Sequence, residues 1–288
     1  MTMNLTRLRA LTLGAALGVG ALVATQWARA RRPANATQRF VRGPAGRLLV
    51  DDGGEGGLPV LFVHSFAGSS VHWRAQLSAL RRERRAVALD LRGQGESSAP
   101  VSGDYRIEQL ARDIAAVADR LDLRRFVLVG HSMGGSAAVA YAAQHPDRLA
   151  GLVLVGTPGR TPAAKSQQIM ASLQQDFEPV MTSYWASLLK GAKPDVRQRL
   201  KRDMSAVPQD AAMAMIQATF EFDPLPALKE FGGPLLLIDT PHGDAPGALH
   251  ALLPQVDRHL ISGTSHWPQL DKPRLFARAL DGFLAELA

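Results

Sequence analysis

The chain of 288 residues contains no cysteine. This absence excludes disulfide bonds, cysteine nucleophiles and metal sites built from thiolates. The eight histidines form no cluster with Asp or Glu at the spacing of metal ligands, so we expect neither a metal nor a cofactor. The redox compartment stays open, because an exported protein does not need disulfides.

Acidic residues are absent from residues 1–42, which carry seven of the chain's 33 Lys and Arg. The remaining 26 basic residues are matched by 26 Asp and Glu, so the net charge of +7 belongs to this N-terminal segment. The rest of the chain is neutral overall. A surface for nucleic acid is therefore not expected.

The N-terminal segment also contains an uncharged stretch, residues 10–28, which follows Arg9. A basic start, an apolar stretch and an A-x-A site at residues 28–30 are the parts of a secretory signal peptide. The stretch is also near the length of an uncleaved anchor, although the arginines beyond it disfavour translocation of that flank. We therefore predict that residues 1–37 are a signal peptide or an N-terminal membrane anchor with a linker. The protein would then be exported (periplasmic or secreted) or membrane-anchored.

Apolar runs typical of buried strands alternate with helical patterns in the rest of the chain. This alternation predicts an α/β fold, with a mostly parallel, doubly wound sheet that helices cover on both faces. The expected strands are residues 58–64, 86–90, 126–129, 149–155, 235–239 and 258–261, with two short strand candidates at residues 38–41 and 47–50.

The alternation stops after residue 155, and residues 161–222 carry helical patterns without a clear strand. We therefore predict a core of residues 38–158 and 232–288, and a helical cap, or lid, of residues 159–231. The lid would cover the carboxyl edge of the sheet, where ligands bind in open α/β sheets. Its apolar side chains suit an apolar acyl group, although packing onto the core explains most of them. They are Ile169, Phe177, Met181, Tyr184, Trp185, Leu188, Met213, Met215 and Phe220.

The strongest motif is Gly130-His131-Ser132-Met133-Gly134, between an apolar strand-like run and a helix of small residues. It matches the G-x-S-x-G nucleophile elbow, a tight turn that holds a serine in a strained, exposed position. Glycines are needed there because larger side chains would clash where strand and helix cross. Ser132 is therefore the predicted nucleophile. The N–H of Met133 is predicted to donate to the developing oxyanion.

A second oxyanion donor is expected from the loop after the strand at residues 58–64. We assign this role to the N–H of Phe66. The neighbouring Ser65 is expected to place a hydroxyl near the site, in the same group of oxyanion and substrate-binding residues.

A serine nucleophile needs a base, and an acid that orients the base. His266 lies in a loop between the last strand and the last helix, where the order Ser…Asp/Glu…His places the base. The acid should come from the loop after residues 235–239, where Asp239 and Asp244 compete. We favour Asp244, because the acid usually stands beyond the end of the strand. Asp239 stays open as the alternative.

Together these segments resemble the α/β-hydrolase superfamily, in particular its branch of capped serine esterases, lactonases and cofactor-free haloperoxidase-like proteins. The resemblance covers about residues 38–288 and rests on the elbow and on residues 64–68, 90–97 and 262–268. The chain departs from the family at Ser65, where the family usually has Gly. Its acid loop also lacks the common Gly-x-x-Asp.

This resemblance implies a serine hydrolase that cleaves small apolar carboxylic esters, or lactones, through an acyl-enzyme on Ser132. Ser rather than Asp at the elbow argues against the haloalkane dehalogenases and epoxide hydrolases of the same fold. Two alternatives stay open. One is a C–C bond hydrolase or an acyltransferase with the same triad, and the other is a non-catalytic binding protein that keeps the fold.

Overall fold

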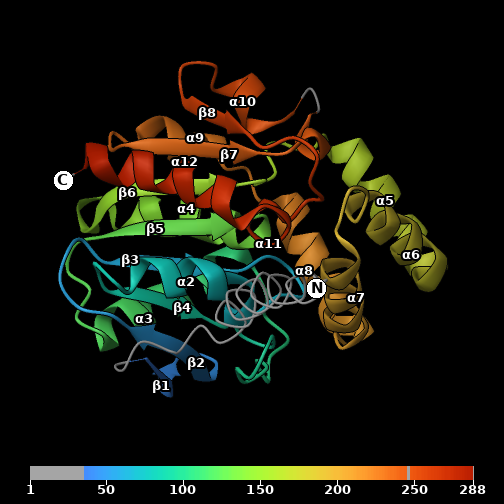
Figure 1. The fold of residues 1–288 in the computed structure, drawn as a ribbon. Helices are drawn as coiled ribbons and strands as arrows, with labels where there is room; N and C mark the ends of the chain where they lie inside the picture. Colours follow the sequence, from blue (N-terminus) through green and yellow to red (C-terminus); the bar gives the residue numbers. More distant parts are fainter. Residues whose placement is uncertain (1–35, 245–246, 288) are drawn as a thin grey trace, which may run out of the picture.

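A sheet of eight strands organises the part of the chain that the computed structural model describes, residues 36–244 and 247–287 (Figure 1). The strands are β1 (Thr37–Gly43), β2 (Gly46–Gly53), β3 (Val60–Val63), β4 (Ala86–Leu89), β5 (Phe126–His131), β6 (Leu149–Val155), β7 (Leu235–Asp239) and β8 (Asp257–Leu260). Their order in the sheet is β1-β2-β4-β3-β5-β6-β7-β8. Strand β2 is antiparallel to β1 and β4, and all other neighbours are parallel.

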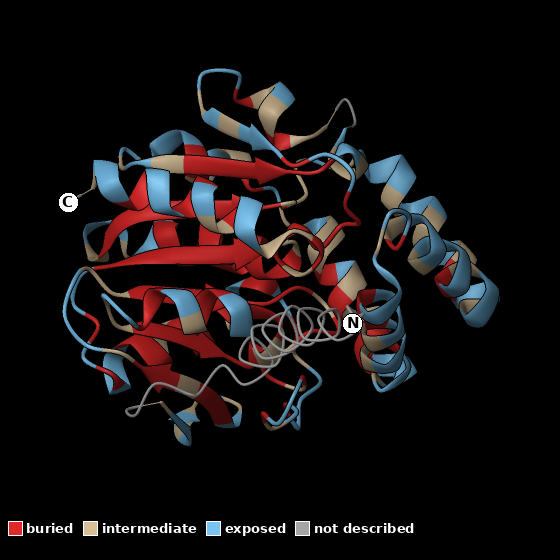
Figure 2. Cartoon of the chain, viewed as in Figure 1, coloured by how far each residue is buried: buried red, intermediate tan, exposed pale blue. Residues whose placement is uncertain are grey.

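Helices bury both faces of the sheet. Successive side chains of a strand point to opposite faces, so each central strand contributes to two hydrophobic clusters. In β3, Val60 and Phe62 pack into one hydrophobic cluster, and Leu61 and Val63 pack into the other. The face of Val60 and Phe62 is covered by α2 (Arg74–Leu80) and α12 (Pro273–Glu286). The face of Leu61 and Val63 is covered by α3 (Ile107–Arg120) and α4 (Met133–Gln144). Figure 2 shows buried strands between helices whose outer faces are exposed. The predicted fold class is confirmed.

Between β6 and β7 the chain is helical. The helices of this segment are α5 (Ala163–Gln175), α6 (Phe177–Leu188), α7 (Pro194–Ser205), α8 (Gln209–Glu221) and α9 (Leu225–Glu230). Figure 1 places α5, α6 and α7 at the end of the sheet toward which the arrows of the parallel strands point. Leu189 and Leu200 of this segment pack there with Ala67 and Trp267 from the core. The helical segment therefore touches the loops in which the predicted site residues lie.

Short elements complete the described fold, and most of them escape sequence patterns because a single turn shows no periodicity. They are η1 (Ser70–Trp73), η2 (Pro146–Arg148), η3 (Pro241–Gly243), α10 (Leu249–Leu252) and α11 (Pro268–Asp271).

The predicted signal peptide or anchor falls on residues 1–37, of which residues 1–35 lie outside the described residues. Within residues 36–244 and 247–287, no helix has the length and apolar character that crossing a membrane requires.

Candidate active site

Ser132 occupies the turn between β5 and α4. Its backbone φ of 53° lies in a region that residues other than glycine rarely adopt, so the surrounding contacts must hold the backbone in this conformation. The N–H of Ser132 donates to the carbonyl of Val155 at 2.9 Å, and its carbonyl accepts from the N–H of Gly135. At the start of α4, Gly134 lies so close to the carbonyl of His64 that a Cβ atom would clash. Ser132 therefore has the conformation expected of a nucleophile at an elbow.

The loop after β3, which touches the elbow at Gly134, contains the predicted oxyanion donor. The N–H of Ala67 in this loop donates to Oε1 of Gln94 at 2.8 Å. By contrast, no acceptor in the described part of the chain is bonded to the N–H of Phe66 or Met133. Met133 is the first residue of α4, so its N–H carries the partial positive charge of a helix N-terminus. These two groups are therefore available to a developing oxyanion.

His64 supports this loop from within the core. The N–H of Leu91 donates to its Nε2 at 3.0 Å, so Nδ1 carries the proton and donates to the carbonyl of Ser65 at 2.7 Å. Burial lowers the pKa of His64 to about 4, so the ring is neutral at pH 7. With both nitrogens bonded, His64 is a support for the oxyanion loop and not a base.

His266 lies beside the elbow and is held by its own backbone. Its N–H donates to the carbonyl of Leu188 in the helical segment at 3.0 Å, and its carbonyl accepts Nε2–H of His131 at 2.9 Å. The imidazole faces Gly156, where a Cβ atom would lie 3.1 Å from Cε1 and 3.3 Å from Nδ1. Gly156 directly follows the residue that binds the N–H of Ser132. The structure thus brings the loop of the predicted base against the elbow, although no hydrogen bond joins the hydroxyl of Ser132 to the ring of His266 in the described residues.

Burial, with a smaller effect of the nearby His242, lowers the pKa of His266 to about 4. The imidazole is therefore neutral at pH 7, as a group that accepts a proton from Ser132 must be.

Neither candidate acid is bonded to the ring of His266. Asp239 is buried at the end of β7 and pairs with Nε of Arg258 at 2.8 Å. Burial raises the pKa of Asp239, and the positive Arg258 opposes this shift. Asp244 is exposed, and its Oδ1 lies 2.9 Å from Nε2 of His250, whose Nδ1 lies 3.4 Å from Asp239. The predicted contact between Asp244 and His266 is therefore not formed, because the carboxylate of Asp244 lies in an ionic cluster beside β7.

Ser65 lies near the site, as the sequence indicated, but its hydroxyl is already engaged. Its Oγ accepts Nε1–H of Trp267 at 3.1 Å and donates to the carbonyl of Phe66 at 3.3 Å. The side chain is buried and ties the oxyanion loop to the residue after His266. Its place in the structure is that of a brace between the two loops.

Comparison with known proteins agrees with this geometry. Residues 59–187 match the family model of the alpha/beta hydrolase fold. A thermophilic esterase from Thermogutta terrifontis superposes with a TM-score of 0.74 at 26% identity, over 88% of this chain and 99% of that one. The chain therefore has the fold of the α/β-hydrolase superfamily.

Curated relatives of this α/β hydrolase are similar over different shares of its length. The sn-1-specific diacylglycerol lipase ABHD11 of Mus musculus is 28% identical over 272 residues, which are 84% of this chain and 85% of that protein. The dihydrolipoyllysine-residue acetyltransferase component of the acetoin cleaving system of Pseudomonas putida is 37% identical over 148 residues. That match covers 49% of this chain and only 40% of the acetyltransferase component. The esterase and the lipase support the expected class of enzyme, a hydrolase that acts on esters.

His131, the second residue of the elbow motif, joins the elbow of the hydrolase to the loop of the base. Its Nδ1 accepts Nε2–H of Gln269 at 3.0 Å, and its Nε2–H donates to the carbonyl of His266. Burial holds the pKa of His131 well below its usual value, so the ring stays neutral and keeps this tautomer. Sequence reasoning missed this function, although the position of His131 inside the motif was a signal for it.

We expect His131→Phe to lower kcat about tenfold to a hundredfold, with a smaller change in KM. Phenylalanine fills the space of the imidazole but leaves the carbonyl of His266 without its donor, so the base is no longer held in place. Steady-state kinetics with a chromogenic ester measures the two constants. His131→Gln keeps an amide donor and should recover part of kcat. Equal activity of the phenylalanine and glutamine variants would contradict a positioning role.

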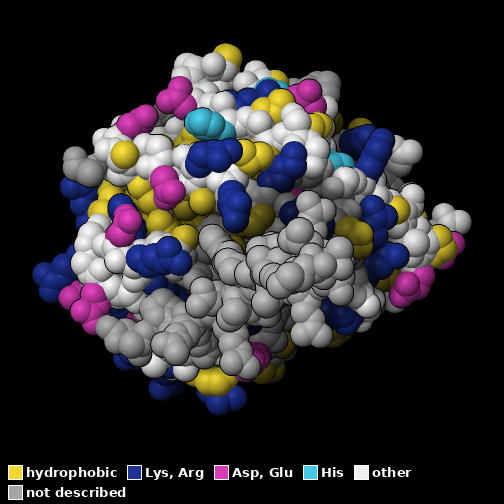
Figure 3. Space-filling model, in the orientation of Figure 1, with side chains coloured by type: hydrophobic (Ala, Val, Ile, Leu, Met, Phe, Trp, Pro, Cys, Tyr) yellow, Lys and Arg dark blue, Asp and Glu magenta, His cyan; other side chains and the backbone are white. Residues whose placement is uncertain are grey.

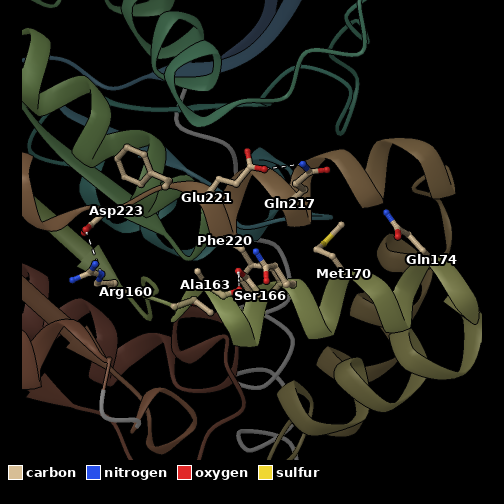
Figure 4. Close-up of a pocket in the computed structure, with 12 residues that line it drawn as sticks. Arg160, Ala163, Ser166, Met170, Gln174, Gln217, Phe220, Glu221 and Asp223 are labelled. Carbon is tan, nitrogen blue, oxygen red and sulfur yellow. Dashed lines mark hydrogen bonds and ion pairs between the residues drawn. The ribbon is translucent and has the colours of Figure 1, made fainter.

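Cavities lie within the helical segment and between this segment and the core. One of about 480 Å³ lies between α5 and α8, where Arg160 lies 3.7 Å from Asp223 (Figure 4). A second, of about 530 Å³, lies among α5, α6 and α8. The third, also about 480 Å³, is lined by α6, α7, the start of α8 and Phe66. This third cavity is the one that reaches the predicted oxyanion loop.

Proposed function

We propose that this α/β hydrolase is a serine hydrolase that cleaves carboxylic esters, or lactones, through an acyl-enzyme on Ser132. The observation that carries the proposal is the strained backbone of Ser132 in an elbow against which the loop of the neutral His266 packs, through the bond from His131 to the carbonyl of His266. The similar diacylglycerol lipase and esterase support an ester as the substrate.

In the proposed reaction, His266 takes the hydroxyl proton of Ser132 while Oγ attacks the carbonyl carbon. The N–H groups of Phe66 and Met133 stabilise the negative charge on the carbonyl oxygen. The ester C–O bond then breaks, and the alcohol leaves with the proton from His266. Water, which gives a proton to His266, attacks the acyl-enzyme, and the C–O bond to Ser132 breaks. The acid is released and Ser132 recovers its proton.

A screen of p-nitrophenyl esters of increasing chain length, together with lactones, tests the proposal. In parallel, the folded protein is treated with a fluorophosphonate probe, and the labelled peptide is identified by mass spectrometry. We expect ester turnover and a single label on Ser132. Folded protein without a label would contradict the enzyme proposal and favour a binding protein. A label without turnover of esters or lactones would favour a C–C bond hydrolase or an acyltransferase.

We propose Asp244 as the acid of the triad, acting once it leaves His250 for His266. Asp244→Asn is then expected to lower kcat by roughly a hundredfold or more. Asp239→Asn should mainly lower the unfolding temperature, because it leaves the partly buried Arg258 without a full partner. His250→Gln removes the nearer of the two partners of Asp244, the other being Nη2 of Arg258 at 3.5 Å, so it should not reduce kcat. Loss of activity in Asp239→Asn alone would make Asp239 the acid.

We also propose that residues 1–37 direct export or anchor the enzyme to a membrane. N-terminal sequencing of the protein from fractionated cells tests this proposal. A mature start near residue 31, or near residue 37 after a second A-x-A site at residues 34–36, fits cleavage. An intact Met1 in the membrane fraction fits an anchor. An intact Met1 in the soluble cytoplasmic fraction would contradict both.

A further inference from the structure

The cavity that Phe66 of the oxyanion loop helps to line has aromatic and apolar walls. The ring of Phe66 stacks on Trp185 of α6, with ring centroids 5.3 Å apart and an angle of 3° between the planes. Met181 and Met204 add apolar surface from α6 and α7. Phe66, whose N–H is the proposed oxyanion donor, therefore also forms part of the wall of this cavity.

One stripe of α7 brings two positive charges to the same cavity. Arg197 and Lys201 line it together with Met204 and Ser205. These positions follow one another at the spacing of a single helix face. Nη2 of Arg197 donates to the carbonyl of Leu189 at 3.3 Å, which holds the guanidinium at the cavity wall.

Neither cation is neutralised by the protein. In the described part of the chain, no carboxylate forms an ion pair with Arg197 or Lys201. Glu178 of α6 also lines the cavity, so the lining as a whole has an excess of one positive charge. Figure 3 shows Lys and Arg side chains over the edge of the molecule where α5, α6 and α7 lie.

We propose that this cavity binds the far end of the substrate's acyl chain and that the far end is an anionic group, a carboxylate or a phosphate. The proposal rests on the proposed ester hydrolase function and names the substrate class for it. The apolar chain would pack along Phe66, Trp185 and Met204. Its terminal oxygens would accept hydrogen bonds from Arg197 and Lys201, since charge-assisted bonds of this kind are the stronger ones.

The test compares esters that differ only in the far end of the chain. The neutral probe is p-nitrophenyl octanoate, the carboxylate probe is p-nitrophenyl hydrogen suberate, and the phosphate probe is the p-nitrophenyl ester of 8-phosphonooxyoctanoic acid. Release of p-nitrophenolate gives kcat/KM for each. We expect the wild-type enzyme to prefer at least one anionic probe by about fivefold or more at low ionic strength, and less at high ionic strength, since both cations are exposed.

Three variants assign the preference to the cavity. The double variant Arg197→Gln/Lys201→Gln should lose it, and Glu178→Gln, which removes the opposing charge, should increase it about twofold to threefold. Arg202→Gln takes one positive charge from an exposed position of the same helix outside the cavity, so it should leave the preference unchanged. A preference that is absent in the wild type, or equal in all four proteins, would overturn the proposal.

Binding separates this proposal from the proposed function. Calorimetric titration of Ser132→Ala with monomethyl suberate and with dimethyl suberate needs no turnover. Tighter binding of the anion, lost in Arg197→Gln/Lys201→Gln, supports the anion site even if every ester screen fails. Equal binding of the two compounds, with esters hydrolysed normally, overturns the anion site and leaves the hydrolase function in place.

Discussion

Ser132→Ala should reduce kcat for a chromogenic ester by about 10⁴-fold or more without unfolding the protein. The substitution removes the oxygen that would form the proposed acyl-enzyme, and the proposed oxyanion donors can then supply only a small residual rate. His266→Ala should have an effect of similar size, because an unassisted serine hydroxyl is a weak nucleophile. Steady-state kinetics and circular dichroism measure rate and fold together.

The double variant Ser132→Ala/His266→Ala sharpens this prediction. Residues that act as one unit are not additive, so the double variant should be about as slow as either single variant. Ser136→Ala, on the same helix one turn further on, is the matched control and should keep its activity. Losses that multiply in the double variant would mean that Ser132 and His266 do not act in one step.

Asp113→Asn should lower the free energy of unfolding by about 3–5 kcal/mol. Nε and Nη2 of Arg92 donate to the two carboxylate oxygens of Asp113 at 2.8 and 2.7 Å. The side chains are 3% and 0% exposed. An amide in place of the carboxylate leaves the positive charge of Arg92 buried without compensation, which is the costly half of breaking a buried ion pair. Urea denaturation, followed by circular dichroism, measures the change.

Arg92→Met/Asp113→Leu should restore most of the lost stability, because removing both charges removes the uncompensated one. Arg124→Gln serves as the control. It breaks the pair of Arg124 with Asp122, which is exposed on both sides, and should leave the denaturation midpoint unchanged. A single-variant loss as small as that of the control would show that the buried pair contributes little.

The buried pair of Arg92 and Asp113 also supports the candidate active site. Arg92 begins the turn that carries Gln94, and Oε1 of Gln94 binds the N–H of Ala67 in the oxyanion loop. The buried pair therefore fixes the turn on which the shape of that loop depends. In the sequence, residues 90–97 stood out only through the family resemblance. Nothing in the sequence pattern indicates that Arg92 pairs with Asp113.

The elbow turn at Ser132 could be predicted because its geometry is local. A buried strand, a glycine at each flank of the His-Ser-Met core and a helix of small residues together force the turn, and all of them are neighbours in the chain. The position of the His266 loop could be predicted for a different reason, since chain order and the alternation of strands place this loop at the carboxyl edge of the sheet. The acid could not. Asp239 and Asp244 are both close to that edge, and their ionic partners in the structure, Arg258 and His250, are set by packing.

Ser65 shows most clearly where sequence reasoning stops. Its identity alone placed a hydroxyl near the oxyanion loop, whereas its function depends on Trp267, which is 202 positions away. The same holds for His131 and the carbonyl of His266. The sequence by itself determined the fold class, the elbow turn at Ser132 and the position of the loop that contains His266, because these follow from patterns between near neighbours and from the order of strands and helices. Only the tertiary structure decided how the elbow, the oxyanion loop and the loop of His266 are held together. The hydrogen bonds that join them connect segments far apart in the sequence, which meet only in the folded chain.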